Sequence, residues 1–184
     1  TKSCLTSNTL SVNALRSRVY LYMGEWAKSL EASQAVLEVK HDLVDMATST
    51  VLPNEYNSSE NILALEQVMT SAYVRAAKVN TTLWRMYTSS DLRRSKYYDQ
   101  RTPSNILVVK GGSNQYACSF RVGEMYLNAA EAALMTGEAA INIARKNLLT
   151  LMEKRYTANG YAAKETAVNA MGRDELLQEI YNER

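Results

Sequence analysis

The chain has 184 residues, of which 46% are hydrophobic and 22% charged, a balance that is ordinary for a globular protein with one core. Its 21 basic and 19 acidic residues leave a net charge of +2, which gives no reason to expect a nucleic-acid partner or a membrane surface. No uncharged apolar run approaches the roughly 20 residues that a bilayer-spanning helix needs. We expect residues 1–184 to form a single domain segment that is incomplete at both ends, because the chain lacks an initiator Met and stops inside a helical pattern.

A helical hairpin is predicted at about 9–39. Apolar residues recur at steps of three and four, which predicts a single buried stripe on the first helix. That stripe consists of Val12, Leu15, Val19, Tyr22 and Trp26. Gly24 is expected to end this helix, and a partner helix follows from residue 26 to about 39. The residues of the partner expected to face inward are Ala27, Leu30 and Leu37, with the small Ser29 and Ser33 permitting close helix contact.

Residues 41–118 are expected to form a loop-rich layer with a few short elements. Turn-forming residues such as Pro53 and Asn54 interrupt the segment 41–60. The apolar run at 60–66 fits either a strand or the start of a helix, because periodicity cannot decide at that length. Further along we predict a short helix around 81–87 and short strands at 97–100 and 106–110, the second closed by Gly111 and Gly112.

A second hairpin is predicted at about 119–156, and its design repeats that of the first, with a helix that reaches a Gly-Glu turn at Gly137 as at Gly24. This likeness is typical of tetratricopeptide-like repeats. The stripe of its first helix is Val122, Met125, Tyr126, Ala129, Ala132 and Ala133, and that of its partner is Ile141, Ala144, Leu148, Leu151 and Met152. Two glycine-containing pairs, at 159–160 and 171–172, predict a loop at 157–172. A helix with Leu176, Leu177 and Ile180 inward is expected from about Arg173.

Signatures of catalysis are missing from the sequence. His41 is the only histidine and has no ligands at metal-binding spacing around it. The nucleophile elbow, the phosphate-binding loop and the dinucleotide fingerprint are also absent. We therefore predict that the protein is not an enzyme and uses no metal or other cofactor. Cys4 and Cys118 have no metal-ligand spacing either; they fit a disulfide, and they fit buried free thiols at least as well.

The aromatic residues are more informative, because twelve tyrosines and two tryptophans stand against one phenylalanine. Tyrosine is an unusual choice for rings that only fill a core, since its hydroxyl needs a partner. Several of these rings lie in the irregular middle of the chain, where loops often carry function. A ring can stack on the face of a sugar while Asn, Asp and Arg groups hydrogen-bond the sugar hydroxyls, and local packing is the alternative role for each ring. The residues nominated as ligand-binding are Tyr73, Trp84, Tyr87, Arg94, Tyr97 and Tyr98.

Five segments, in this order, resemble a known family. Residues 13–26 look like the first clear hairpin of that family, and the segments 60–65 and 91–98 resemble its next two motifs. Residues 121–137 are similar to its R-x-x-E-x-Y-L-x-x-A-E-A helix, and 175–184 resemble the start of a later segment. The family is that of the SusD/RagB-like outer-membrane lipoproteins of Bacteroidetes, whose members are mostly helical and built around tetratricopeptide-like hairpins.

The resemblance implies a mainly α fold and a non-catalytic glycan-binding protein on the extracellular face of the outer membrane. It implies delivery of an oligosaccharide to a SusC-like TonB-dependent transporter, with membrane attachment only through a lipid anchor that this chain does not contain. No family binding residue is transferred to this sequence, so the six nominated residues rest on their chemistry and location. The alternative function is a tetratricopeptide-like scaffold that binds a peptide or another protein.

Overall fold

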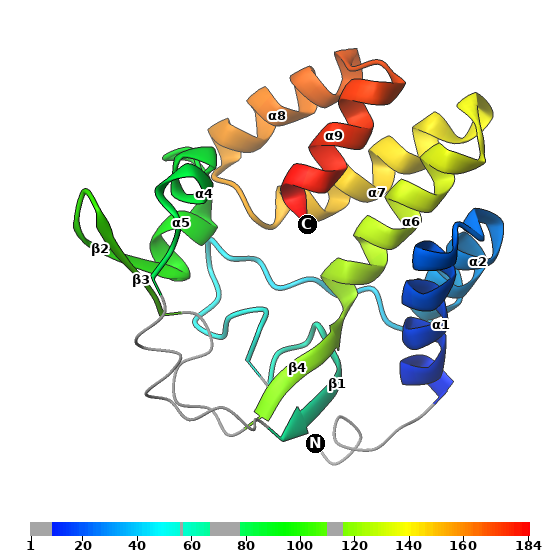
Figure 1. The fold of residues 1–184 in the computed structure, drawn as a ribbon, viewed down its shortest axis with the longest axis horizontal. Coiled ribbons are helices and arrows are strands. Elements are labelled where there is room, and N and C mark those ends of the chain that lie inside the picture. Colours follow the sequence, from blue (N-terminus) through cyan, green and yellow to red (C-terminus); the bar gives the residue numbers. More distant parts are fainter. Residues whose placement is uncertain (1–8, 56, 67–77, 110–115) are drawn as a thin grey trace.

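The structure is a computed structural model that describes residues 9–55, 57–66, 78–109 and 116–184. It is mainly helical with a few short strands (Figure 1), which confirms the predicted fold class. The elements are α1 (Thr9–Met23), α2 (Trp26–Leu37), β1 (Asn61–Glu66), α4 (Thr81–Met86), α5 (Leu92–Lys96), β2 (Tyr98–Thr102), β3 (Asn105–Val108), β4 (Tyr116–Arg121), α6 (Val122–Thr136), the 3-10 turn η2 (Glu138–Ala140), α7 (Ile141–Glu153), α8 (Ala158–Ala170) and α9 (Arg173–Glu183). Among the helices in the described ranges, none combines the length and apolar character that a bilayer span requires.

Helices α1, α2, α6, α7 and α9 form a helical frame. Helix α6 lies at its centre and is buried on nearly every side. It packs against α2 on one side and α7 on the other (Figure 1). The predicted stripe of α6 is confirmed, because Val122, Met125 and Ala129 are fully buried and Tyr126 packs against the core. The helix ends at Gly137, whose φ of 134° suits a residue without a side chain. The many alanines of α6 let the neighbouring helices approach closely.

The hairpin of α1 and α2 turns at Gly24, whose φ is 73°, but the predicted buried stripe of α1 is wrong. Val12, Leu15 and Val19 are 44–49% exposed and Tyr22 is 87% exposed. The buried face of α1 instead consists of Ser11, Ala14, Ser17 and Leu21. Side-chain size explains the difference, because small residues let α1 pack closely against α2.

Hydrogen bonds satisfy the serines at this contact. Ser17 Oγ lies 2.7 Å from Ser33 Oγ, Ser29 Oγ donates to the Ser17 carbonyl oxygen, and Asn128 Nδ2 of α6 donates to Ser17 Oγ at 2.9 Å. The small Ser29 and Ser33 therefore permit the close contact that their size predicted. Ala27, expected to face inward, is exposed, whereas Leu30 and Leu37 are half-buried against the core.

Residues 158–170 form helix α8, so the loop predicted at 157–172 is wrong. Helix α8 begins after Thr157, whose side chain accepts a hydrogen bond from Gly160 N. In the sequence Gly160 predicts a turn, but in the structure its role is to allow close packing. A Cβ atom at this position would lie 2.5 Å from Ser90 Cβ. Helix α9 follows as predicted, with Leu176 and Ile180 fully buried.

Two antiparallel strand pairs complete the fold. The run at 60–66 is a strand, β1, which pairs with β4 so that Asn61 lies opposite Arg121. The predicted strands at 97–100 and 106–110 appear as the hairpin β2–β3, shifted by one or two residues, and the predicted helix at 81–87 is α4. The sequence reading missed α5 and β4. Gly111, Gly112 and Cys4 lie outside the described residues.

Candidate ligand-binding site

The segment 78–109, which contains α4, α5, β2 and β3, stands beside the helical frame (Figure 1). Polar residues start both of its helices. Asn80 Oδ1 accepts a hydrogen bond from Thr82 N at 2.8 Å and thereby caps α4. Asp91 Oδ1 accepts one from Arg93 N at 2.9 Å and caps α5. These caps set the direction in which both short helices present their side chains.

The segment 78–109 brings four of the nominated rings into one aromatic cluster, made of Trp84, Tyr87, Tyr97 and Tyr98. The Tyr98 ring is central, with its centroid 5.7 Å from that of Trp84, 5.3 Å from that of Tyr87 and 6.5 Å from that of Tyr97. The Trp84 and Tyr97 pairs are edge-to-face, a favourable geometry for aromatic rings. The hydroxyls of Tyr87 and Tyr98 lie 3.1 Å apart, so these two rings hold each other in place.

The nominated residues differ in their access to solvent. Trp84 and Tyr97 are buried, with 7% and 5% of their surface exposed, whereas Tyr87 and Tyr98 are half-buried. Arg94 lies with its guanidinium carbon 4.7 Å from the Trp84 ring centroid and donates to the Tyr87 carbonyl oxygen. Arg94 therefore packs on Trp84 of the aromatic cluster and is hydrogen-bonded to the backbone of Tyr87. Tyr73 lies outside the described residues.

A cleft of about 610 Å³ opens between the segment 78–109 and the frame, and we call it the α4–α9 cleft. Tyr87, Tyr97 and Tyr98 line it, but Trp84 and Arg94 do not. Its other polar and aromatic lining residues are Arg93, Arg121, Glu124, Arg155, Gln178, Tyr181, Asn182, Glu183 and Arg184. Its apolar lining residues are Leu83, Met86, Leu127 and Leu151, with Gly123 beside them.

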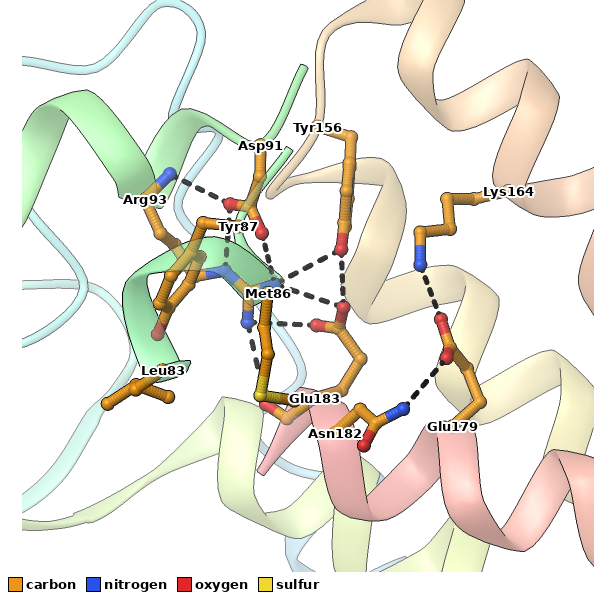
Figure 2. Close-up of a pocket in the computed structure, with 10 residues that line it drawn as sticks. All are labelled: Leu83, Met86, Tyr87, Asp91, Arg93, Tyr156, Lys164, Glu179, Asn182 and Glu183. Carbon is orange, nitrogen blue, oxygen red and sulfur yellow. Dashed lines mark hydrogen bonds and ion pairs between the residues drawn. The ribbon is translucent and has the colours of Figure 1, made fainter. Parts of the chain in front are cut away.

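An ion-pair network closes one side of the cleft, next to a smaller cavity of about 240 Å³ (Figure 2). Arg93 Nη2 lies 2.7 Å from Asp91 Oδ2, and Arg93 Nη1 lies 2.9 Å from Glu183 Oε2. The Tyr156 hydroxyl donates to Glu183 Oε1 at 2.6 Å. This network joins α5 to α9 across 90 residues of sequence.

The network stabilises the charged form of Arg93 and the neutral form of Tyr156. Burial acts to lower the pKa of Arg93, but the carboxylates of Glu183 and Asp91 outweigh it and raise the pKa above its usual range. Burial, reinforced by the charge of Glu183, raises the pKa of Tyr156. Arg93 is thus a permanent cation and Tyr156 a neutral donor, and neither group is suited to move a proton near neutral pH.

A second buried ion pair lies at the wall of the cleft, where Arg155 is one of the lining residues. Arg155 Nη2 lies 2.7 Å from Glu60 Oε1, and both side chains are almost completely buried. Glu60 Oε1 also accepts a hydrogen bond from Val44 N at 3.0 Å. Gly123 leaves room for this pair, because a Cβ there would lie 3.1 Å from Glu60 Oε2. The pair therefore joins the residue before β1 to the turn after α7, with the loop after α2 and the first turn of α6 close to it.

The sequence does not mark the ion-pair residues Asp91, Arg93, Tyr156 and Glu183 as part of a site, although the segment 91–98 is one of the family-like motifs. Asp91 and Arg93 are close in the sequence, but Tyr156 and Glu183 are far from them, so no local spacing signals the network. Among the described residues, no group of three or more His, Cys, Asp or Glu side chains is placed to hold a metal ion. The arrangement suits binding through ring faces and fixed hydrogen-bond donors.

Comparison with known proteins identifies the family. The model of the SusD family matches residues 45–184, which is most of the chain. The chain belongs to the SusD family. A comparison with curated protein sequences finds no match.

Solved SusD-like structures share the fold. A SusD superfamily protein from Bacteroides fragilis matches with a TM-score of 0.76 at 20% identity, covering 100% of this chain and 45% of its own. One from Bacteroides thetaiotaomicron gives a TM-score of 0.75 at 22% identity, covering 99% and 47%. A protein from Bacteroides vulgatus described as a SusD-like carbohydrate-binding protein matches with a TM-score of 0.74 at 16% identity. The match covers 98% of this chain and 42% of that protein. This SusD-family chain thus spans less than half the length of these relatives.

Proposed function

We propose that this SusD-family protein binds an oligosaccharide in the α4–α9 cleft without cleaving it. The observation that carries the proposal is the composition of the cleft wall, in which three tyrosines of the aromatic cluster face arginine, asparagine and glutamine side chains. The description of the Bacteroides vulgatus relative as carbohydrate-binding supports the same conclusion.

The cleft offers both kinds of contact that a sugar requires. The half-buried rings of Tyr87 and Tyr98 are held by each other and by Trp84, so little side-chain entropy is lost when a sugar stacks on them. Tyr181 of α9 lines the cleft from the other side and is 46% exposed. The amides of Gln178 and Asn182 supply donors and acceptors for sugar hydroxyls. Ring faces would give affinity, and the amides would select the orientation.

Isothermal titration calorimetry of the protein against a panel of oligosaccharides tests this proposal. For a glycan that binds, the double change Tyr98→Ala and Tyr181→Ala should weaken affinity by about tenfold or more, since each ring contact is worth roughly 0.5–1.5 kcal/mol. Tyr22→Ala is the matched control, because Tyr22 is exposed on α1 and lies outside the cleft lining. Absence of binding across the panel, or undiminished affinity in the double variant, contradicts the proposal.

We further propose that the protein acts on the extracellular face of the outer membrane and passes its ligand to a TonB-dependent transporter. The family resemblance motivates this proposal, and the exposed apolar row of α1 supports a protein contact. Val12, Leu15 and Val19 form a row of apolar side chains that are 44–49% exposed to solvent. A contiguous exposed apolar surface of this kind is typical of a site that contacts another protein.

Co-purification with a co-expressed TonB-dependent transporter tests the contact. The triple change Val12→Ser, Leu15→Ser and Val19→Ser should reduce recovery of the complex severalfold without unfolding the protein, since these side chains lie outside the core. Ile143→Ser on α7 is the control, because Ile143 is 40% exposed and belongs to another face. Equal recovery of wild type and triple variant would show that α1 is not the contact.

A peptide is the second candidate ligand, and a groove on the α1–α2 hairpin favours it. This groove, of about 440 Å³, is lined by Asn13, Arg16, Tyr20, Lys28 and Glu31 among others. Arg16 and Lys28 lie over the Tyr20 ring, at 5.8 Å and 5.7 Å from its centroid. Binding of an acidic peptide that is lost on Arg16→Ala and Lys28→Ala, with no response to any glycan, would favour the scaffold function instead.

A further inference from the structure

Arg121 is the one arginine of the α4–α9 cleft whose guanidinium has no partner within the described residues. It is the last residue of strand β4 and the N-cap residue of α6, so its backbone is fixed by both elements. The side chain is half-buried in the cleft and does not cap the helix. Its charge acts on the hydroxyl of Tyr97, lowering a pKa that burial and other groups raise overall. Arg121 therefore lies on the tyrosine-lined side of the cleft.

The other arginines around the cleft are all neutralised by the protein. Arg93 pairs with Asp91 and Glu183. Arg155 pairs with Glu60 at 2.7 Å, and Arg184 pairs with Glu131 at 2.6 Å. The contrast with Arg121 is sharp, because every other cationic group of the lining has a carboxylate within ion-pair distance.

The acidic groups of the lining are neutralised as well. Glu124 accepts two hydrogen bonds of 2.7 Å from Arg18, and Glu183 is held by Arg93 and Tyr156. An anion that enters the cleft therefore meets paired carboxylates and one unpaired cation. The local field around Arg121 favours a negative charge.

The residues that the structure does not describe offer no obvious carboxylate for Arg121. Residues 1–8, 56, 67–77 and 110–115 contain neither Asp nor Glu. The side chain of Glu66 is the one acidic group left undescribed, and it belongs to the opposite end of β1 from Asn61, the residue that pairs with Arg121.

A half-buried guanidinium without a counter-ion is costly, because burial removes part of its hydration and nothing in the protein replaces it. Its flat, fork-like set of donors matches a carboxylate, which it can bind with two parallel hydrogen bonds. Resting on the proposed glycan-binding function, we infer that the ligand of the α4–α9 cleft is an acidic oligosaccharide that contains a uronic acid, whose carboxylate pairs with Arg121. The sugar rings then stack on the neighbouring tyrosines.

Calorimetry with a matched pair of ligands tests the inference. The probes are a short oligogalacturonate and the same oligosaccharide with its carboxyl groups reduced to alcohols. The acid should bind about 10–100-fold more tightly than the reduced form at low salt, as expected for hydrogen bonds to a charged group. This advantage should shrink as salt is raised, because the pair is partly open to solvent.

Variants then assign the effect to Arg121. Arg121→Gln should abolish the preference for the acid, because it weakens binding of the acid far more than binding of the reduced oligosaccharide, and Arg121→Lys should keep part of the preference. Arg101→Gln is the matched control, because Arg101 is exposed on β2 and lies outside the cleft. Its affinities should equal those of the wild type.

The outcomes separate this inference from the function on which it rests. Equal or tighter binding of the reduced oligosaccharide, or an acid preference that survives in Arg121→Gln, overturns the role of Arg121 while glycan binding stands. Absence of binding for both probes and for the whole neutral panel overturns the proposed function itself. If Arg121→Gln does not fold, Arg121→Lys and the salt dependence of the wild type still decide between these outcomes.

Discussion

The helical frame and the segment 78–109 are stabilised by different forces. In the frame, formed by α1, α2, α6, α7 and α9, side chains such as Leu134, Leu148 and Ile180 are completely buried in a continuous apolar core. In the segment 78–109, ring contacts around Tyr98 and the ion pairs of Arg93 take the place of such a core. The frame therefore depends on buried area, and the segment depends on a few specific polar and aromatic contacts.

This difference explains why the candidate site lies where the two regions meet. A rigid frame fixes the positions of Arg121 and Tyr181, while the segment 78–109 supplies Tyr87 and Tyr98 on short helices and strands. A small set of contacts can be altered at such a junction without disturbing the core. Substitutions in the frame should therefore destabilise the whole fold, whereas substitutions in the segment 78–109 should change local structure.

The largest effect is expected where the frame contains a buried charge. Arg155→Met leaves the fully buried carboxylate of Glu60 without its partner, which should lower the free energy of unfolding by about 3–5 kcal/mol. Urea denaturation followed by circular dichroism measures this loss. The double variant Glu60→Leu with Arg155→Met should recover much of it, because no lone charge remains buried.

An exposed pair provides the control for the Arg155 experiment. Arg101→Met removes a surface partner of Asp99 on β2 and should change the free energy of unfolding by less than about 0.5 kcal/mol. If Arg155→Met and Arg101→Met had similar effects, the buried pair would not stabilise the frame in the way that its burial indicates.

A smaller and more local effect is expected at Glu183, which ties α9 to the segment 78–109. Glu183→Gln weakens the charged hydrogen bonds from Arg93 and Tyr156, a loss of roughly 1.5–3 kcal/mol. Hydrogen exchange should show faster exchange in residues 78–109 and little change in α6. Glu153→Gln, on the exposed face of α7, should leave both regions as in the wild type. Faster exchange throughout α6 would mean that the two regions unfold as one unit.

The sequence predicts the frame well where apolar periodicity and packing agree. In α6 the stripe through Val122, Met125 and Ala129 is both apolar and buried. In α1 the same reasoning fails, because small residues and the hydrogen bonds of Ser17 form the contact and leave Val12 exposed. Periodicity measures hydrophobicity, and it does not measure how closely two helices can approach.

The candidate site is less predictable from the sequence. The residue types of the aromatic cluster were recognisable, because tyrosine-rich loops are suited to binding, but which rings are exposed depends on packing that no local pattern shows. Asp91 and Glu183 are 92 positions apart in the numbering and meet only in the folded chain. The pair Asn159–Gly160 predicts a turn, and the actual role of Gly160 appears only from its contact with Ser90.

That contact leads to a prediction at the edge of the segment 78–109. Gly160→Ala places a methyl group against Ser90 and should lower the free energy of unfolding by about 1–3 kcal/mol. Adding Ser90→Gly should restore part of the loss by making room. Gly172→Ala is the control, because a Cβ there meets only Glu175 Oε2 at 4.0 Å and costs little. Thermal denaturation of the four proteins tests the contact, and a double variant no better than Gly160→Ala alone would argue against it.

The smallest effect is expected in the alkaline range and concerns the aromatic cluster alone. Burial, and then the hydrogen bond with Tyr87, raises the pKa of Tyr98 above the value of about 10 that a free tyrosine has. Folding therefore favours the neutral phenol, so this stabilisation is complete below about pH 10 and is lost as the pH rises through the folded-state pKa. Tyr98→Phe removes the titrating group and should make the fall of Tm above pH 10 shallower, while at neutral pH it costs at most about 1 kcal/mol for one hydrogen bond. Melting curves between pH 8 and about pH 11, with tyrosinate absorbance recorded in parallel, measure both quantities. An alkaline decline as steep as that of the wild type would show that the cluster does not stabilise the segment through Tyr98, and that its rings serve the ligand more than the fold.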